Sequence, residues 1–464
     1  MRSFVIALLG ALLSSLASAK QAANFNLSST TLTEYGCDET CQMIFTLAQK
    51  KDWELFKSEF DFQFYSTSCN FTGSQAGDLL KFEPVDPTKL DVVSGVSVYR
   101  FQYTSRSLNG SLVPASGFIG IPYTSFRKDR KYKVIAYAHG TIGLFAGCPP
   151  STTPSLYDYT SWSLLVNQGY AIVAPDYAGL GNDYIQHQYL SFPAHANDLY
   201  YGLVAARKAF PNLFTREWMA VGHSQGGGAV WKLSESPLHR TEAAGTYLGS
   251  VALAPASKIY DMTLLAVEKI TGLSDYANYD VVYESLFLPI AIKRIFPGTS
   301  TSFLTEKFLN RIALATRAQS CYYGIMSLAY GLKPSEMFTG LSALKQNNEL
   351  KQWQNWVAPA NGAQAAGPVM IVQGLNDTAV LPPITINSYR DACRYGNEMH
   401  LRLYKGMDHT DVLTASAPEW LTYISSRFAH PNHTHGECST ATRAPFDAAH
   451  MVTSSEVDDL IGNS

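Results

Sequence analysis

The chain has little charge and lacks the long apolar runs that mark several large classes of protein. Only 16% of its 464 residues are charged, and the formal net charge is −3 at pH 7. The absence of a basic stripe argues against nucleic acid as a partner. Beyond the N-terminus there is no stretch of about 18 uncharged apolar residues, which argues against a transmembrane segment. These absences favour a soluble globular protein.

The spaced ligand motifs of common metal sites are also missing. The sequence contains neither His-Glu-x-x-His nor paired Cys-x-x-Cys, so no metal is predicted, and nothing indicates a cofactor. His433, His435 and Cys438 lie close together near the end of the chain, where a solvated tail explains them better than a metal site. We therefore look for chemistry that side chains perform alone.

The N-terminus has the three parts of a secretory signal peptide. Arg2 supplies the positive charge, Phe4 to Leu13 the apolar run, and Ala17-Ser18-Ala19 the small-residue cleavage site. We predict that residues 1–19 are removed before Lys20 and that the protein is secreted.

Secretion changes how the cysteines are interpreted. In an oxidising compartment most cysteines pair, and an odd count leaves one over. The sequence alone does not establish which of the seven pair; they are Cys37, Cys41, Cys69, Cys148, Cys321, Cys393 and Cys438. Asn-x-Ser/Thr sequons predict glycosylation candidates at Asn26, Asn70, Asn109 and Asn432.

Short apolar strands alternate with helical patterns along much of the chain. Such alternation predicts an α/β fold with a mostly parallel central sheet and helices on both faces. We expect an N-terminal extension over 20–95, a core over 96–255 and 366–438, a helical cap over 256–365, and a loosely ordered tail over 439–464. Insertions at the carboxyl ends of strands lie over the site in open α/β sheets, although an unrelated helical layer is the alternative.

One motif suggests the chemistry. Gly222-His223-Ser224-Gln225-Gly226 follows a short apolar strand and precedes a helical stretch. A strand-to-helix turn this sharp needs small residues beside the serine, which Gly222 and Gly226 supply. Since G-x-S-x-G occurs by chance in roughly one chain of this length in six, the motif needs support from an acid, a base and an oxyanion hole.

An acid and a base follow in the order that this fold requires. A serine needs a base to take its proton, and the chain order is serine, acid, histidine, each after a successive strand. Asp377 follows the strand 369–373, and His409 follows the strand 400–404. We predict that Ser224, Asp377 and His409 form a catalytic triad. The weaker candidates for the acid are Asp176, Asp408 and Asp411, of which Asp411 is better explained as a helix start.

The oxyanion of the tetrahedral intermediate requires two donors. The backbone N–H of Gln225 is one, and the loop His139-Gly140-Thr141 after an earlier strand should supply the other. We predict the Thr141 N–H as this second donor, whereas a purely structural turn is the alternative.

Taken together, these stretches resemble the fungal secretory lipase family of the lipase A type, within the α/β-hydrolase superfamily. The matching segments are 137–141 with 148–151, 176–181, 222–229, 253–255 and 373–377. The resemblance implies ester hydrolysis by the triad under a helical cap, and the disulfides Cys148–Cys321 and Cys393–Cys438. A further sequon, at Asn376, adjoins the predicted acid, and we expect it to stay unglycosylated because a glycan would block the site.

The resulting hypothesis is a secreted carboxylic ester hydrolase, a lipase or esterase acting on a small-molecule or lipid ester, with a lipid–water interface as one place of action. Short-chain acetyl esterase and lactone esterase activities are alternatives. A serine peptidase on the same fold would need a cap acid to hold the substrate amine, and the sequence leaves five candidates open: Glu268, Asp275, Asp280, Glu284 and Glu306. A non-catalytic binding module would not need an intact triad.

Overall fold

A computed structural model of the chain describes residues 21–56, 59–432 and 436–453. The predicted signal peptide at 1–19, together with His433 and His435, lies outside the described residues. Within them, none of the helices is both long and apolar enough to cross a membrane.

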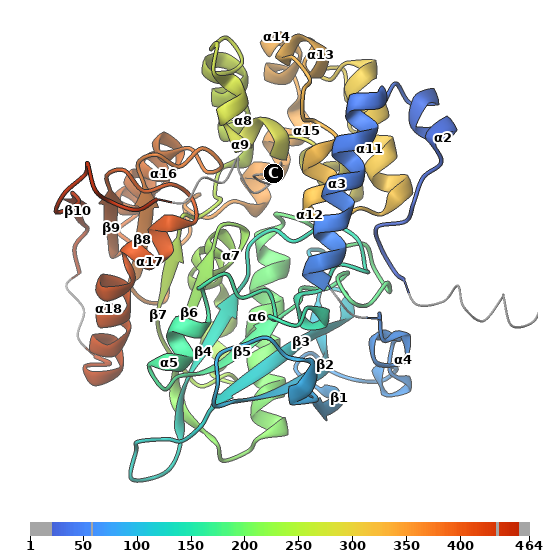
Figure 1. Cartoon of the computed structure of the whole chain (residues 1–464). Helices are drawn as coiled ribbons and strands as arrows, with labels where there is room; N and C mark the ends of the chain where they lie inside the picture. Colours follow the sequence, from blue (N-terminus) through green and yellow to red (C-terminus); the bar gives the residue numbers. More distant parts are fainter. Residues whose placement is uncertain (1–20, 57–58, 433–435, 454–464) are drawn as a thin grey trace, which may run out of the picture.

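One large sheet runs through the centre of the molecule (Figure 1). Its strands are β1 (Leu79–Pro84), β2 (Val96–Arg106), β3 (Leu112–Pro122), β4 (Tyr132–Ala138), β5 (Ala171–Pro175), β6 (Phe214–His223), β7 (Thr246–Leu253), β8 (Val369–Gly374), β9 (Met399–Tyr404) and β10 (Ser439–Arg443). Their spatial order is β1-β2-β3-β5-β4-β6-β7-β8-β9-β10. Neighbours pair antiparallel from β1 to β5 and parallel from β5 to β10, which confirms the predicted mostly parallel sheet.

Helices cover both faces of this sheet. Those that belong to it are α5 (Ser163–Asn167), α6 (Phe192–Ala209), α7 (Gln225–Ser234), α16 (Pro382–Arg394), α17 (Asp411–Ala415) and α18 (Ala417–Ala429). Side chains of β4 alternate between two cores because successive residues of a strand point to opposite faces. Val134 packs in the core that contains residues of α6 and α7, and Ile135 packs in the core that contains residues of α5 and α18.

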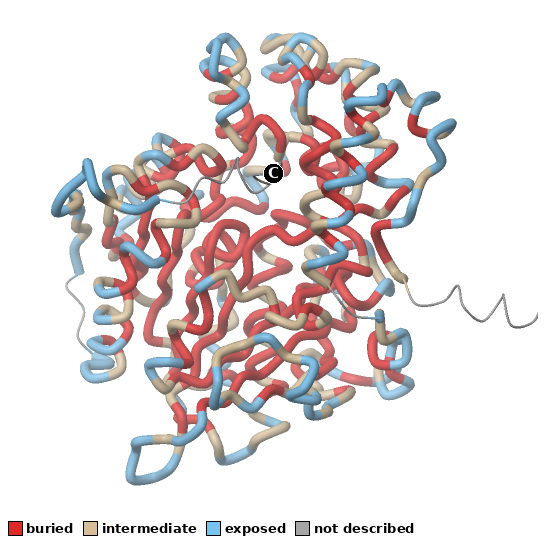
Figure 2. Tube along the Cα trace, in the orientation of Figure 1, coloured by how far each residue is buried: buried red, intermediate tan, exposed pale blue. Residues whose placement is uncertain are grey.

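A long helical segment interrupts the chain between β7 and β8, and we call its helices the cap helices. They are α8 (Ile259–Leu265), α9 (Asp280–Glu284), α10 (Phe287–Ile295), α11 (Glu306–Ala318), α12 (Tyr322–Ser327), α13 (Pro334–Met337), α14 (Leu341–Lys345) and α15 (Asn348–Val357). In Figure 1 most of them stand above the upper end of the sheet, and in Figure 2 the buried trace continues from the sheet into them.

The N-terminal part adds α2 (Ser29–Glu34), α3 (Glu39–Phe56) and α4 (Phe62–Tyr65). Two expected boundaries need correction. The extension expected over 20–95 contains β1, which pairs with β2 and so belongs to the sheet. The tail expected to be loosely ordered from 439 begins with β10, which pairs in parallel with β9. Without β10 the backbone of β9 would be an unpaired sheet edge, and pairing satisfies those groups.

The segment 157–168 is not helical for most of its length. Tyr157 and Thr160 have φ values of 54° and 61°, in the left-handed region, which a right-handed helix cannot accommodate. Only Ser163–Asn167 is helical there, as α5.

Three disulfides are present. They join Cys148 to Cys321 and Cys393 to Cys438, as the resemblance implied, and Cys37 to Cys41 at the start of α3. Cys69 is free and exposed. The four asparagines named as glycosylation candidates are all exposed, and their modification stays a prediction.

Candidate active site

Ser224 occupies a strained turn between β6 and α7. Its φ of 56° and ψ of −118° are rarely adopted by a residue with a side chain. Its backbone is held in place because its N–H donates to the Leu253 carbonyl at 2.9 Å, while its carbonyl accepts from Gly228 at 3.1 Å and Ala256 at 3.0 Å. The turn presents the side chain at the carboxyl end of the central strands.

The flanking glycines are required by close backbone contacts. A Cβ on Gly222 would lie 2.3 Å from the carbonyl oxygen of Gly226, and one on Gly226 would lie 2.0 Å from that of Ala138. Both distances are far shorter than any van der Waals contact, so a side chain at either position would displace the turn.

Asp377 and His409 form a buried pair beside this turn. His409 Nδ1 lies 2.8 Å from Asp377 Oδ2. The Asp377 carboxylate also accepts from Gln373 Nε2 at 2.8 Å and from the N–H groups of Ala379 and Val380 at 3.0 and 2.7 Å. Because His409 donates through Nδ1, its Nε2 is left as the proton acceptor.

The weaker acid candidates lie elsewhere. Asp176 accepts from Ser116 and Ser151, and burial raises its pKa to about 6. Asp408 accepts from the N–H groups of Thr410 and Asp411 at the start of α17. Asp411 is the first residue of that helix and Thr410 is its N-cap, so the N–H group at the helix start is bound by the Asp408 side chain.

The loop after β4 lies against Ser224. A Cβ on Gly140 would be 3.5 Å from Ser224 Cβ. The Thr141 hydroxyl forms a hydrogen bond with the Tyr189 hydroxyl at 2.8 Å, and the Thr141 carbonyl accepts from the Tyr157 hydroxyl at 2.5 Å. Both groups are therefore already paired with tyrosines. The Thr141 N–H makes no hydrogen bond to any residue that the structure describes, which leaves it available as a donor.

Gln225 turns its side chain away from the nucleophile. Its Nε2 lies 3.3 Å from His187 Nε2 and 3.2 Å from His195 Nε2. Burial lowers the pKa of His187 to about 3 and that of His195 well below its usual value, so both rings are neutral and can accept. With its side chain bound inward, Gln225 can offer only its backbone N–H, one of the unpaired groups at the start of α7.

His223 forms a hydrogen bond with the backbone of His409. Burial and the nearby His409 hold the pKa of His223 well below its usual value, so the ring is neutral. Its Nε2 donates to the His409 carbonyl at 3.0 Å, and its Nδ1 accepts from the Tyr159 hydroxyl at 2.9 Å. That hydroxyl in turn accepts from the Gly140 N–H at 3.3 Å. This chain of bonds connects the loop after β4 with the loop that carries His409.

Ser224, His409, Gly140 and Thr141 line one cavity of about 350 Å³. Its other walls come from α3, from the loop 155–159, and from the cap helices α9 and α12. Leu55 is the residue that α3 contributes, and nothing in the sequence indicated it. Tyr159 and His223 were not expected to line the site either, although His223 belongs to the motif itself.

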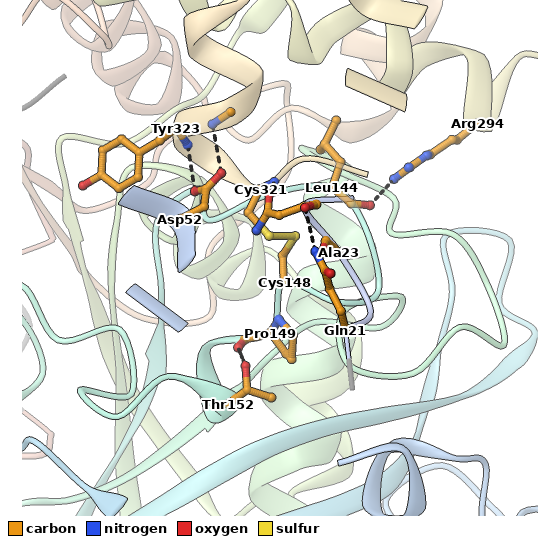
Figure 3. Close-up of a disulfide and its surroundings, with 12 residues drawn as sticks. Gln21, Ala23, Asp52, Leu144, Cys148, Pro149, Thr152, Arg294, Cys321 and Tyr323 are labelled. Carbon is orange, nitrogen blue, oxygen red and sulfur yellow. Dashed lines mark hydrogen bonds between the residues drawn. A yellow bond between two sulfur atoms is a disulfide. The ribbon is translucent and has the colours of Figure 1, made fainter. Parts of the chain in front are cut away.

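Three parts of the chain are joined beside this cavity (Figure 3). The disulfide Cys148–Cys321 links the loop after β4 to the start of α12. Asp52 of α3 accepts from two N–H groups in the first turn of α12, those of Tyr323 and Gly324, at 3.1 and 2.9 Å. The N-terminal extension, the core loop and the cap are thereby held in one arrangement.

Comparison with known proteins adds a fold assignment. No family model matches the chain, and no curated protein matches it in sequence. The ligand-bound rice cell wall degrading esterase LipA from Xanthomonas oryzae is similar in structure, with a TM-score of 0.60 at 17% identity over 76% of this chain and 98% of that one. Candida antarctica lipase A in its closed state gives 0.61 at 13% identity over 87% and 93%. The chain therefore has the α/β-hydrolase fold that these enzymes share.

Proposed function

We propose that this chain is a secreted serine carboxylic ester hydrolase that works through an acyl-enzyme on Ser224. The observation that carries the proposal is the shared cavity. Ser224, on its strained strand-to-helix turn, and His409 line this cavity together, and Nδ1 of His409 is bound to the buried Asp377 carboxylate. This combination is the one that acyl transfer by serine requires.

The steps follow from these positions. His409 Nε2 takes the proton of the Ser224 hydroxyl as its oxygen attacks the ester carbonyl carbon. The N–H groups of Thr141 and Gln225 stabilise the oxyanion, and His409 then gives the proton to the leaving alcohol. Water, activated by His409 in the same way, hydrolyses the acyl-enzyme and restores the serine. Asp377 orients the imidazole and stabilises its charged form.

The proposal extends to the family and to the cap. Membership of the fungal secretory lipase family of the lipase A type is supported by the motifs at 137–141, 222–229 and 373–377 and by the fold. We also propose that residues 256–365 act as the cap that selects the substrate, since α9 and α12 line the cavity. Triacylglycerols, short acyl esters and lactones remain the candidate substrate classes.

A series of acyl esters from two carbons upward tests the function, with an aminoacyl anilide included to detect a peptidase. Ser224→Ala and Asp377→Asn should each retain the fold by circular dichroism. Asp377→Asn should lower kcat by about 10⁴, because the wrong tautomer of His409 is then favoured. Ester hydrolysis that survives Ser224→Ala would overturn the triad, and cleavage of the anilide without the esters would favour the peptidase.

A further inference from the structure

The cavity beside Ser224 is acidic. Three carboxyl groups line it, those of Asp158, Asp280 and Glu284, and no lysine or arginine is among its described lining residues. The cap acids Glu268, Asp275 and Glu306 are exposed and do not line it. Of the five acids that the sequence left open, the fold thus selects two.

These carboxyl groups differ in how they are used. Asp158 accepts from the N–H groups of Ser161 and Ser163, and Asp280 accepts from the Thr378 hydroxyl at 2.7 Å. The Glu284 carboxyl has no hydrogen bond or ion pair to any residue that the structure describes. Its carboxyl therefore lies at the cavity wall with its bonding capacity unused.

The surroundings of Glu284 disfavour the ionised form of its carboxyl group. Loss of solvent, together with the negative charges of Asp280 and Asp377, raises its pKa to about 7 against the opposing effect of His409. The Tyr189 hydroxyl is another titratable group near it. A cation in the cavity would favour the ionised carboxylate and offset the cost of its burial.

Aromatic rings line the same cavity. Tyr157 and Tyr159 pack with their ring centroids 5.1 Å apart on one wall, and Tyr322 and Tyr323 pack with theirs 5.4 Å apart on the cap side. Tyrosine rings attract cations through their electron-rich faces, and the attraction increases when water is excluded. Carboxylates and the faces of aromatic rings both stabilise a bound ammonium group.

We propose that the substrate carries a cationic ammonium group close to its scissile ester, and that Glu284, aided by Asp280 and the tyrosine rings, holds that group in the cavity. The inference rests on the proposed ester hydrolysis and adds its substrate class. Glu284 acts here as a specificity-determining residue, and it takes no part in proton transfer.

Matched esters that differ only in one charge test this inference. Acetylcholine and 3,3-dimethylbutyl acetate place the charge, or its neutral carbon isostere, on the alcohol side. Ethyl 4-(trimethylammonio)butyrate and ethyl 5,5-dimethylhexanoate place it on the acyl side. The ratio of kcat/KM within each pair is the cation selectivity, and the two pairs show which side of the ester is recognised. If an ester pair is not hydrolysed, choline and 3,3-dimethyl-1-butanol are tested as competitive inhibitors of the best ester substrate. The ratio of their inhibition constants then measures the preference for the cation.

We expect the wild type to favour the cation in at least one pair, and Glu284→Gln to lower that selectivity roughly tenfold or more through KM, as loss of a desolvated charge pair would. Glu284→Asp should keep part of it. Asp275→Asn, which changes an exposed acid of the same segment, should leave it unaltered. Labelling of Ser224 by a fluorophosphonate verifies that each variant retains an intact site.

The pH profile provides a second readout. The quaternary ammonium group keeps its charge at every pH, and the neutral isostere corrects for titration of His409. Selectivity should rise as the pH passes through about 7 in the wild type, because Glu284 becomes ionised, and should stay flat in Glu284→Gln. A selectivity of one or below in both ester pairs and in the inhibitor pair, with hydrolysis still dependent on Ser224, would overturn the inference alone. Hydrolysis independent of Ser224 would overturn the proposed function instead.

Discussion

Replacing Ser224 by glycine should make the protein inactive and also more stable than replacing it by alanine. Both variants remove the hydroxyl, and only glycine removes the Cβ that makes the backbone angles of 56° and −118° costly. The three hydrogen bonds that fix this residue are made by its backbone, so both variants keep them.

The size of the effect follows from two opposing contributions. A side chain in such a sparsely populated conformation costs about 1–3 kcal/mol. Glycine adds about 0.5–1 kcal/mol of backbone entropy to the unfolded chain, which opposes the gain. The free energy of unfolding of Ser224→Gly should therefore be about 1 kcal/mol higher than that of Ser224→Ala. Urea denaturation measures both, provided that the two variants show the same dependence of this free energy on urea concentration.

A matched pair in ordinary helix distinguishes local strain from a general effect of glycine. Ser426 is exposed within α18. There the glycine variant should be less stable than the alanine variant by up to about 1 kcal/mol, so the sign of the difference is reversed. If glycine is the less stable substitution at position 224 as well, the turn stores no strain and our reasoning about the nucleophile is wrong.

Two further predictions concern stability. Replacing Cys148 and Cys321 together by serine should destabilise the protein by as much as about 5 kcal/mol, because the bridge spans 173 positions of sequence, whereas removing the bridge at the start of α3, which spans 4, should cost about 2. Denaturation under non-reducing conditions measures both, and equal losses would contradict the chain-entropy argument. Burial raises the pKa of Asp52 from 3.8 to about 7, so the folded protein retains a proton that the unfolded chain releases. The stability due to this group is greatest below about pH 4 and falls as the pH rises to about 7, and Asp52→Asn should flatten that part of the pH–stability curve, whereas an unchanged slope would show that Asp52 is ionised throughout.

Patterns within single strands and turns were enough to predict much of the fold and the residues of the site. The carboxyl ends of parallel strands meet at one edge, so Asp377 after β8 and His409 after β9 could be expected beside Ser224. In the structure, His409 lines the same cavity as Ser224 and is bound to Asp377. Their catalytic roles stay predictions until variants are assayed.

Features that depend on distant contacts could not be predicted in this way. β10 pairs in parallel with β9, and nothing within Ser439–Arg443 indicates this partner. Tyr157 adopts a left-handed conformation that its residue type disfavours, so the sequence gives no sign of this turn. Leu55 reaches the cavity only because α3 packs against α12, which lies more than 260 residues further along the chain.

The bridge between Cys148 and Cys321 also makes two walls of the cavity unlike in how they are held. It holds two Cα atoms 5.8 Å apart, one on the loop beside Ser224 and one at the start of α12. The wall formed by α12 is therefore joined covalently to the core loop. The helix α9, which carries Asp280 and Glu284, lies in the stretch from 255 to 320, where the sequence has no cysteine. The acidic wall of the cavity is thus held by noncovalent contacts, such as the hydrogen bond from Thr378 to Asp280, whereas the wall that bears Tyr322 and Tyr323 is held by a covalent bond.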